Sequence, residues 1–237
     1  VQAESLTPKR IVPITVWSAL FLRLSWGLVC GLKTIRSVTN ARLAGKGLML
    51  WEGTIDDATL IAAPSSTKNR EEKRDEEMHQ TKKGRQWCFG MKTHISVDAQ
   101  SGLVHTVLGT AANVSDVPQA QALLHGDEID VFGDAGYQGV EKRDENLAVP
   151  VTWHIAMLPA KHKALRETPQ GKLVDWIEHT KASIRAKVEH PFHVLKNLLR
   201  HRKTPDRGLA KNTAQLFSLF GFANLVLARR RLLEART

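Results

Sequence analysis

Three acidic residues stand in local settings that suit metal-dependent cleavage of a phosphodiester. Two of them are expected at the ends of apolar, strand-like segments. Asp57 follows the first residues of the β-branched run 54–62, and Asp134 directly follows the apolar residues 131–133. The third, Glu189, lies in a basic stretch with helical spacing. Carboxylates from two strands and a helix can hold two divalent metal ions, which stabilise the attacking and leaving oxygens together.

The two aspartates also have ordinary interpretations. Asp134 precedes Ala-Gly-Tyr-Gln-Gly, so it could simply cap the turn that follows. Asp56 adjoins Asp57, and either could be a polar residue at a strand end. Because alternation along a strand sends neighbours to opposite faces, only one of this pair can join Asp134.

Glu189 belongs to a basic segment that has an ordinary interpretation too. Helical spacing relates Arg185, Glu189, His193 and Lys196, which could form a solvated ladder of ion pairs around a bend at Pro191. A zinc site at His190 and His193 is disfavoured, because HPFH lacks partner cysteines and the H-E-x-x-H arrangement.

Composition favours a polyanionic partner. The chain has 237 residues and a net charge of +10, and its stretch 181–211 is almost purely basic. Within that stretch Arg200, Arg202 and Lys203 are candidate phosphate contacts. Cys30 and Cys88 show no metal-binding spacing, which favours a reducing cytosol. Signatures of serine hydrolases, P-loop ATPases and Rossmann enzymes are absent from the sequence.

The N-terminal region is unusual. Residues 11–32 are long and apolar enough for a membrane span or an export signal. Arg23 near the middle and Pro13 near the start argue against a span. We therefore expect no membrane association, and we expect residues 1–38 to be an atypical segment, truncated or altered.

The pattern of apolar residues predicts an α/β fold. Strands are expected at 54–62, 86–98, 103–110 and 129–134 and within 147–159, with an exposed excursion at 65–85. Helices are expected from an N-cap at Ser115 to about 126, over 169–196 with an interruption at Pro191, and over 208–233. A mixed sheet covered by helices accommodates this order of elements.

These residues together resemble a known family. From about Thr39 to its end the chain resembles the DDE transposases of small bacterial insertion sequences, in the branch whose first motif reads V-D-A-T-I-I-x-A-P-S-S-T-K-N. The matching segments are 56–61 with 64–69, 113–116, 134–139, the R-(3)-E-(6)-K element of Arg185, Glu189 and Lys196, 208–217 and 229–232.

The resemblance implies an RNase H-like mixed sheet flanked by helices, with a long C-terminal amphipathic helix, over residues 39–237. It implies that Asp57, rather than Asp56, joins Asp134 and Glu189 as catalytic residues and ligands of two Mg²⁺ or Mn²⁺ ions. The implied activity is DNA strand cleavage and transfer of the 3′ end to target DNA. Arg185 and Lys196 would steady phosphates or the helix of Glu189.

The implied partners are DNA, as terminal inverted repeats and as target, and a second copy in a homodimer on DNA. The implied location is the bacterial cytoplasm, at the nucleoid when DNA is bound. Three departures stand out: Ala182 replaces a tyrosine, and segments 197–206 and 1–38 do not match the family. A catalytically inactive, DNA-binding remnant and a protein anchored in a membrane by residues 11–32 therefore remain as alternatives.

Overall fold

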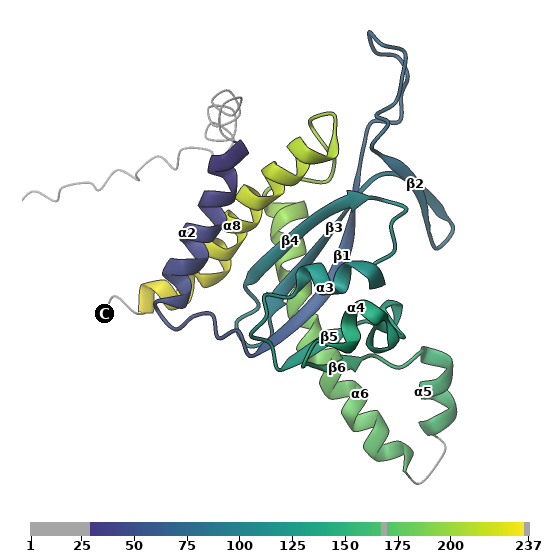
Figure 1. Cartoon of the computed structure of the whole chain (residues 1–237), viewed down its shortest axis with the longest axis vertical. Coiled ribbons are helices and arrows are strands. Elements are labelled where there is room, and N and C mark those ends of the chain that lie inside the picture. The colour runs from purple at the N-terminus through teal and green to yellow at the C-terminus, as the bar shows by residue number, and fades with distance from the viewer. Residues whose placement is uncertain (1–28, 167–169, 235–237) are drawn as a thin grey trace, which may run out of the picture.

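A six-stranded mixed sheet forms the centre of the computed structural model, which describes residues 29–166 and 170–234 (Figure 1). Its strands are β1 Gly53–Ala62, β2 His79–Lys83, β3 Gln86–Asp98, β4 Val104–Ala111, β5 Asp130–Gly133 and β6 Thr152–Ile155. β3 pairs antiparallel with β1, with β4 and, through its first residues, with β2. β1, β5 and β6 run parallel. The predicted mixed sheet is confirmed.

Helices cover both faces of this sheet. They are α2 Val29–Ala44, α3 Ala120–Leu123, α4 Asp144–Leu147, α5 Pro159–Arg166, α6 Gly171–Arg185, α7 Glu189–His193 and α8 Leu209–Glu234. Figure 1 shows α2 and α8 side by side to the left of the sheet and α3 and α4 in front of it, while α5 and α6 project from the β6 edge. The main core lies between the sheet and the helices α7 and α8, with Ile55, Ile95, Leu195 and Phe220 fully buried.

The helix α8 completes this core and is joined by hydrogen bonds to α2 and β4. Leu216, Phe220 and Ala223 of α8 are buried in the main cluster. The side-chain amide of Asn224 accepts a hydrogen bond from the Val104 N–H (2.8 Å) and donates to the Val104 carbonyl (2.7 Å) and to Asn40 of α2 (2.9 Å). Buried amide groups need such partners, so this network fixes how α2, β4 and α8 meet.

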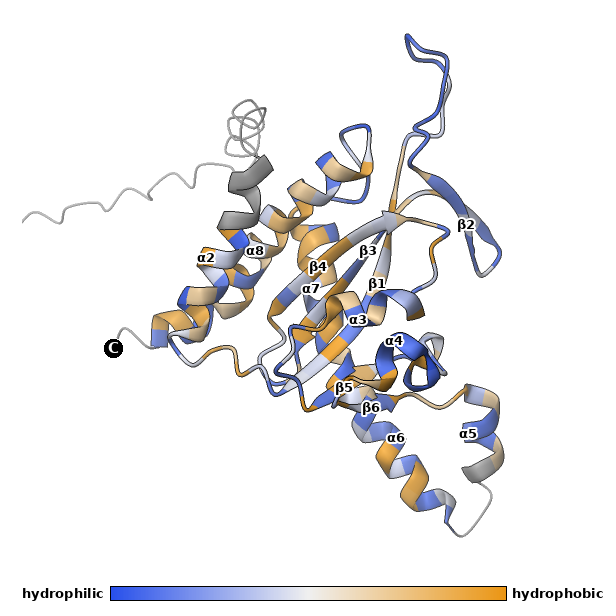
Figure 2. Ribbon diagram, viewed as in Figure 1, coloured by the Kyte–Doolittle hydropathy of each residue, from blue (hydrophilic) through white to orange (hydrophobic). Residues whose placement is uncertain are grey.

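The expectation that α8 is amphipathic is only partly right. Its expected apolar stripe is buried or half-buried, but Phe222, Leu225 and Val226 on another side are each about 40% exposed, at 41%, 43% and 41%. α8 packs against both the sheet and α2, so its buried residues occupy more than one side of the helix, while these three apolar residues stay partly outside both contacts. Figure 2 shows this spread of apolar residues along α8.

Pro191 does not interrupt its helix, contrary to expectation. α6 passes through a 3₁₀ turn at Ala186–Val188 into α7, so the proline lies in the first turn of a new helical segment. A missing N–H is tolerated in that position because first-turn amides have no partner within the helix.

Three further details differ from the sequence-based expectations. Ser115 is not the cap of a long helix: a 3₁₀ turn at Val117–Gln119 leads into the four-residue α3. The excursion 65–85 is mostly exposed, as predicted, but it contains β2. Asp57 lies in the middle of β1 rather than at a strand end, because β1 continues to Ala62 after its parallel neighbour β5 has ended.

The boundary expected between residues 38 and 39 falls inside α2. Most of the apolar segment 11–32 lies outside the described residues. Within 29–166 and 170–234, no helix combines the length and the apolar character that crossing a membrane requires.

A buried histidine makes the stability of this fold sensitive to acid. His105 of β4 contacts Thr54 Oγ1 through Nε2 at 3.1 Å, and its ring lies 4.8 Å from that of His125. Burial lowers the pKa of His105 to about 3; His125 and Arg36 contribute to the lowering and Asp98 opposes it. His105 is therefore neutral in the folded protein.

We expect His105→Gln to reduce the loss of stability on acidification. The folded-state pKa lies below the unfolded value near 6.5, so the unfolded chain binds the proton more tightly. The stability that the neutral His105 contributes to the fold is complete above pH 6.5 and is lost as the pH falls toward 3. At pH 5 the loss in free energy of unfolding is about 2 kcal/mol. Urea unfolding at pH 7 and pH 5 measures this difference in the free energy of unfolding, with a substitution of the exposed His79, His79→Gln, as control. Identical pH dependence in wild type and His105→Gln would refute the assignment.

Candidate active site

The sheet brings Asp57 and Asp134 to the same level on the same face. β1 and β5 are paired in parallel up to Ile55 and Phe132, and each aspartate follows two residues later in its own segment. Residues two apart in a strand point to the same face of the sheet. Both carboxylates therefore lie just beyond the paired region, on the face of the sheet to which Ile55 points.

Asp134 combines this position with the capping role that was the alternative interpretation. Its Oδ1 accepts a hydrogen bond from the Gly136 N–H at 2.7 Å, at the start of the 3₁₀ turn Ala135–Tyr137. This turn packs closely on β5, because a Cβ on Gly133 would come within 3.1 Å of the Tyr137 Cβ. Capping employs one carboxylate oxygen and fixes where the group points, while the other oxygen has no such partner among the contacts of the turn.

Glu189 approaches from the helical layer. It is the first residue of α7, and its side chain is exposed. Among the ion pairs formed within the described residues, none joins Glu189 to Arg185 or His193. The ladder of ion pairs expected from the spacing alone is therefore not present in this part of the chain.

The electrostatics of Asp57 show that these groups are neighbours. The pKa of Asp57 is raised to about 6, mainly by burial and also by the carboxylates of Asp134 and Glu189. A hydrogen bond from the Ala58 N–H (2.7 Å) and the charge of Arg185 oppose the rise. Asp57 thus lies among two acids and one guanidinium, and the repulsion among the carboxylates favours a cation.

Asp56 lies on the opposite face of β1. It is 1% exposed, and its Oδ1 accepts a hydrogen bond from the Ser96 hydroxyl of β3. Burial raises the pKa of Asp56 to about 7 despite this bond, and Glu128 and Asp57 contribute to the rise. The strand alternation expected from the sequence therefore separates a buried, hydrogen-bonded Asp56 from the Asp57 that faces α7.

The basic candidates are distributed around the carboxylates. Lys196, in the π-helical turn Val194–Leu198, donates a hydrogen bond to Thr59 Oγ1 of β1. Arg202 donates to the Lys196 carbonyl (3.0 Å) and to the side chain of Asn197. π-Helical turns often occur at functional sites because they redirect side chains.

Arg200 and Lys203 are exposed, and Arg200 has the positive φ of 55° that non-glycine residues rarely adopt. The neighbouring chain forms a parallel bridge to the end of β1, between Ala62 and Lys203. The structure thus brings Arg185 and Lys196 to the carboxylates and leaves Arg200 and Lys203 on the adjoining surface.

Two residues at this site were missed from the sequence. Thr59, a buried strand residue, anchors Lys196. Lys83 of β2 lies at the same pocket as Glu189 and Lys196. Thr59 lies within the first matching motif, but it has no charge that would mark it as a site residue. Lys83 belongs to the charged excursion 65–85, which has no apolar periodicity to place it in a sheet.

The donor set at the three carboxylates fits Mg²⁺ or Mn²⁺, which prefer carboxylate oxygens. The spacing does not yet match a coordination sphere: within the described residues, no three histidine, cysteine, aspartate or glutamate side chains are close enough to hold one ion. Ion binding would therefore have to draw Glu189 toward the two aspartates. The exposed side chain of Glu189 leaves it free to change rotamer.

The family of the chain follows from residues 52–225, which match the model for "Transposase DDE domain". The chain belongs to the DDE transposase family. The match covers well over half of the chain and includes the three carboxylates of the candidate site. With it the expected RNase H-like fold class of the transposase domain is confirmed: three antiparallel strands, β1, β3 and β4, are followed by the parallel β5 and β6.

Among solved structures, this transposase domain is similar to one described as "Mos1 transposase paired-end complex with left transposon end". The identity is 12% and the TM-score 0.27, over 96% of this chain and 66% of the other, so this chain spans about two thirds of the relative's length.

Proposed function

We propose that the chain is the catalytic domain of an insertion-sequence transposase, which cleaves donor DNA and joins its 3′ end to target DNA. The observation that supports this most directly is the parallel register of β1 and β5, which aligns Asp57 with Asp134 opposite the charge of Glu189. Membership of the DDE family supplies the class of reaction.

In this proposal Asp57, Asp134 and Glu189 hold two divalent metal ions. Bound there, the ions would supply Lewis-acid stabilisation of the attacking and leaving oxygens. Arg185 neutralises part of the carboxylate charge near Asp57, and Lys196, held by Thr59, positions a DNA phosphate beside the site. The Gly136 amide keeps the Asp134 carboxylate in place.

Further parts of the proposal follow from the family resemblance. The substrates are the terminal inverted repeats of the element and the target DNA, bound by a homodimer in the bacterial cytoplasm. Residues 39–237 form the catalytic domain, to which the first part of α2 belongs as well because that helix runs across the expected boundary, and the residues before α2 are an atypical segment.

The deciding experiment is cleavage and strand transfer by the full chain with an end-containing duplex in Mg²⁺ and in Mn²⁺. A nicked or joined product that disappears with EDTA supports the proposal. A chain that binds the duplex but forms no product with either metal is the inactive DNA-binding remnant. Two observations favour that alternative: segment 197–206 departs from the family, and the carboxylates do not yet form a coordination sphere.

We expect the triple variant Arg200→Gln, Arg202→Gln and Lys203→Gln to weaken DNA binding across all sequences. Each lost phosphate contact should reduce the slope of log affinity against log salt by about 0.9 for duplex DNA, so the full effect is a slope smaller by roughly 2.7. Filter binding between 50 and 200 mM salt measures it. An unchanged slope would assign the three residues to the solvated surface.

A further inference from the structure

A pocket of about 560 Å³ lies beside Glu189. Its walls come from the second half of β1, the hairpin of β2 and β3, and the helical segment from α7 to the π-helical turn. The residues that line it are Thr59, Leu60, Ala62, Lys83, Cys88, Glu189, Phe192, His193, Lys196, Asn197 and Arg202. Three of these are cationic at neutral pH and only Glu189 is anionic, so the pocket favours an anion.

The hairpin of β2 and β3 places Lys83 at this pocket. The hairpin closes through Gly84, whose φ of +61° suits the first position of a two-residue turn, followed by Arg85. Lys83 is paired with Gln86 and lines the pocket together with Cys88. Since side chains alternate along a strand, Lys82 points to the other face.

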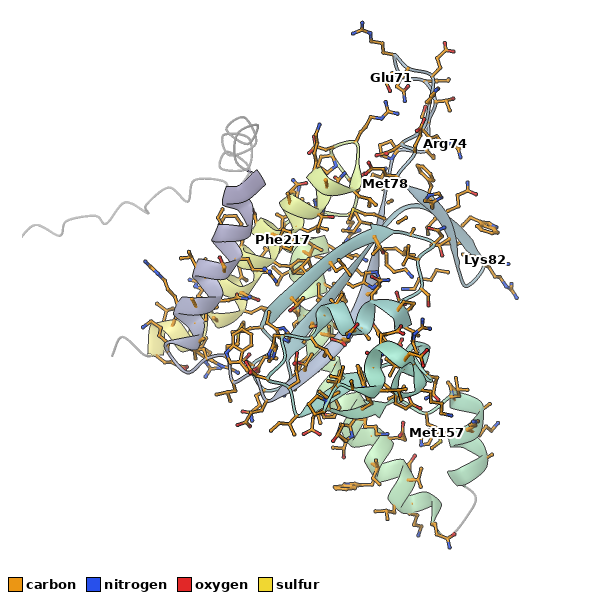
Figure 3. The ribbon with its side chains drawn as sticks, viewed as in Figure 1. Glu71, Arg74, Met78, Lys82, Met157 and Phe217 are labelled. Atoms are coloured by element: carbon orange, nitrogen blue, oxygen red, sulfur yellow. The ribbon has the colours of Figure 1, made fainter. Side chains whose placement is uncertain are left out.

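Lys82 indeed has a different neighbour. It is paired with Trp87, and its Nζ lies 6.0 Å from the centroid of the exposed Trp87 ring. Figure 3 places Lys82 near the tip of the projecting hairpin, and Figure 2 shows the β2 strand as strongly hydrophilic. Two adjacent lysines of one strand thus have the same charge and exposure but face different surroundings.

Lys83 and Lys196 come from segments far apart in the sequence and are close enough to repel each other. Burial lowers the pKa of Lys196; Lys83 and Arg202 contribute to the lowering, while Glu189 and Asp57 oppose it. A bound anion would relieve the repulsion among the three cations.

We propose that this pocket binds the sugar-phosphate backbone of a single DNA strand next to the carboxylates, with Lys83 as a strand-positioning residue. A volume of about 560 Å³ is that of a small-molecule site. It suits one or two nucleotides and is far too small for a duplex. Lys83, Lys196 and Arg202 would contact the phosphates, and Phe192 and Leu60 would pack against the sugar or base. That the strand is DNA rests on the proposed function.

Protection of Cys88 from alkylation tests this proposal in the full chain. Cys88 is a partly exposed free thiol of the pocket wall, and peptide mass spectrometry reads its modification separately from that of Cys30. We expect hexathymidylate, without metal, to slow alkylation of Cys88. Lys83→Gln should require about tenfold more oligonucleotide for half-protection, because the variant loses one charge-assisted contact to the strand. Lys82→Gln, the matched control, should behave as wild type.

Three outcomes would overturn the inference: no protection, equal effects of Lys83→Gln and Lys82→Gln, or equal protection by a blunt duplex. A parallel cleavage assay separates this inference from the proposed function. Protection without cleavage by the wild type supports the pocket and refutes the catalytic proposal. Cleavage without protection refutes the pocket and leaves the catalytic proposal standing.

Discussion

Glu189→Gln is expected to abolish metal-dependent cleavage while DNA affinity stays the same or rises. The substitution keeps the shape of the side chain and removes one of three carboxylates needed to hold the metal ions. Losing the several kcal/mol that metal ions contribute to the transition state corresponds to a rate reduction of about a thousandfold or more. One negative charge also leaves a site that must accept phosphates, which favours DNA binding.

Cleavage assays in Mg²⁺ and Mn²⁺, run beside filter-binding titrations, measure both parts of this expectation. Glu76→Gln serves as control, because it removes the same charge from the exposed segment between β1 and β2. If Glu189 merely formed an exposed ion pair, the change would cost only about 0.3–0.5 kcal/mol of stability and cleavage would persist. Retained cleavage in Glu189→Gln would therefore remove this residue from the active site.

Asp57→Asn and Asp56→Asn should differ sharply although the two residues are adjacent. We expect Asp57→Asn to lose cleavage by about a thousandfold or more, because the carboxylate facing Asp134 is lost. Asp56→Asn should remain active, because it lies on the other face and an amide oxygen can still accept the hydrogen bond from Ser96. Equal losses in the two purified variants would show that the assignment of the faces is wrong.

A thermal melt separates loss of chemistry from loss of folding in these variants. Burial and two neighbouring acids raise the pKa of Asp57, so its ionised form is disfavoured in the metal-free protein. Removing that charge should leave the Tm at pH 7.5 unchanged or higher. Added Mg²⁺ should raise the Tm of the wild type and of Asp56→Asn, since a ligand that binds only the folded state stabilises it. Asp57→Asn should show a much smaller shift.

The sequence predicts the sheet well because its strands carry local signals. β1 and β4 are rich in β-branched residues, β3 alternates, and Asp134 follows a short apolar run, so their positions could be predicted without a partner. The alternation that separates Asp56 from Asp57 is likewise a local property of one strand. The family resemblance added the choice between the two.

Other features depend on contacts between distant segments and could not be read locally. β2 has no apolar pattern, since all but one of its five residues are exposed, and it exists because the start of β3 offers an edge. Pro191 is tolerated because the preceding turn is 3₁₀, which the sequence does not announce. The contact of α8 with α2, a segment far away in the sequence, buries residues on more than one side of the helix, which a single apolar stripe does not predict.

The position of α8 also bears on when during synthesis this domain can fold. Leu216, Phe220 and Ala223 form part of the wall of the main core, and Asn224 supplies the partners of Val104 and Asn40, yet all four residues lie in α8, the last helix of the described residues. While the ribosome still holds this helix, β1, β3 and β4 present an uncovered apolar face. The nascent sheet must therefore wait until α8 has left the ribosome, and a chain cut before α8 is expected to be an aggregation-prone fragment rather than a smaller folded domain.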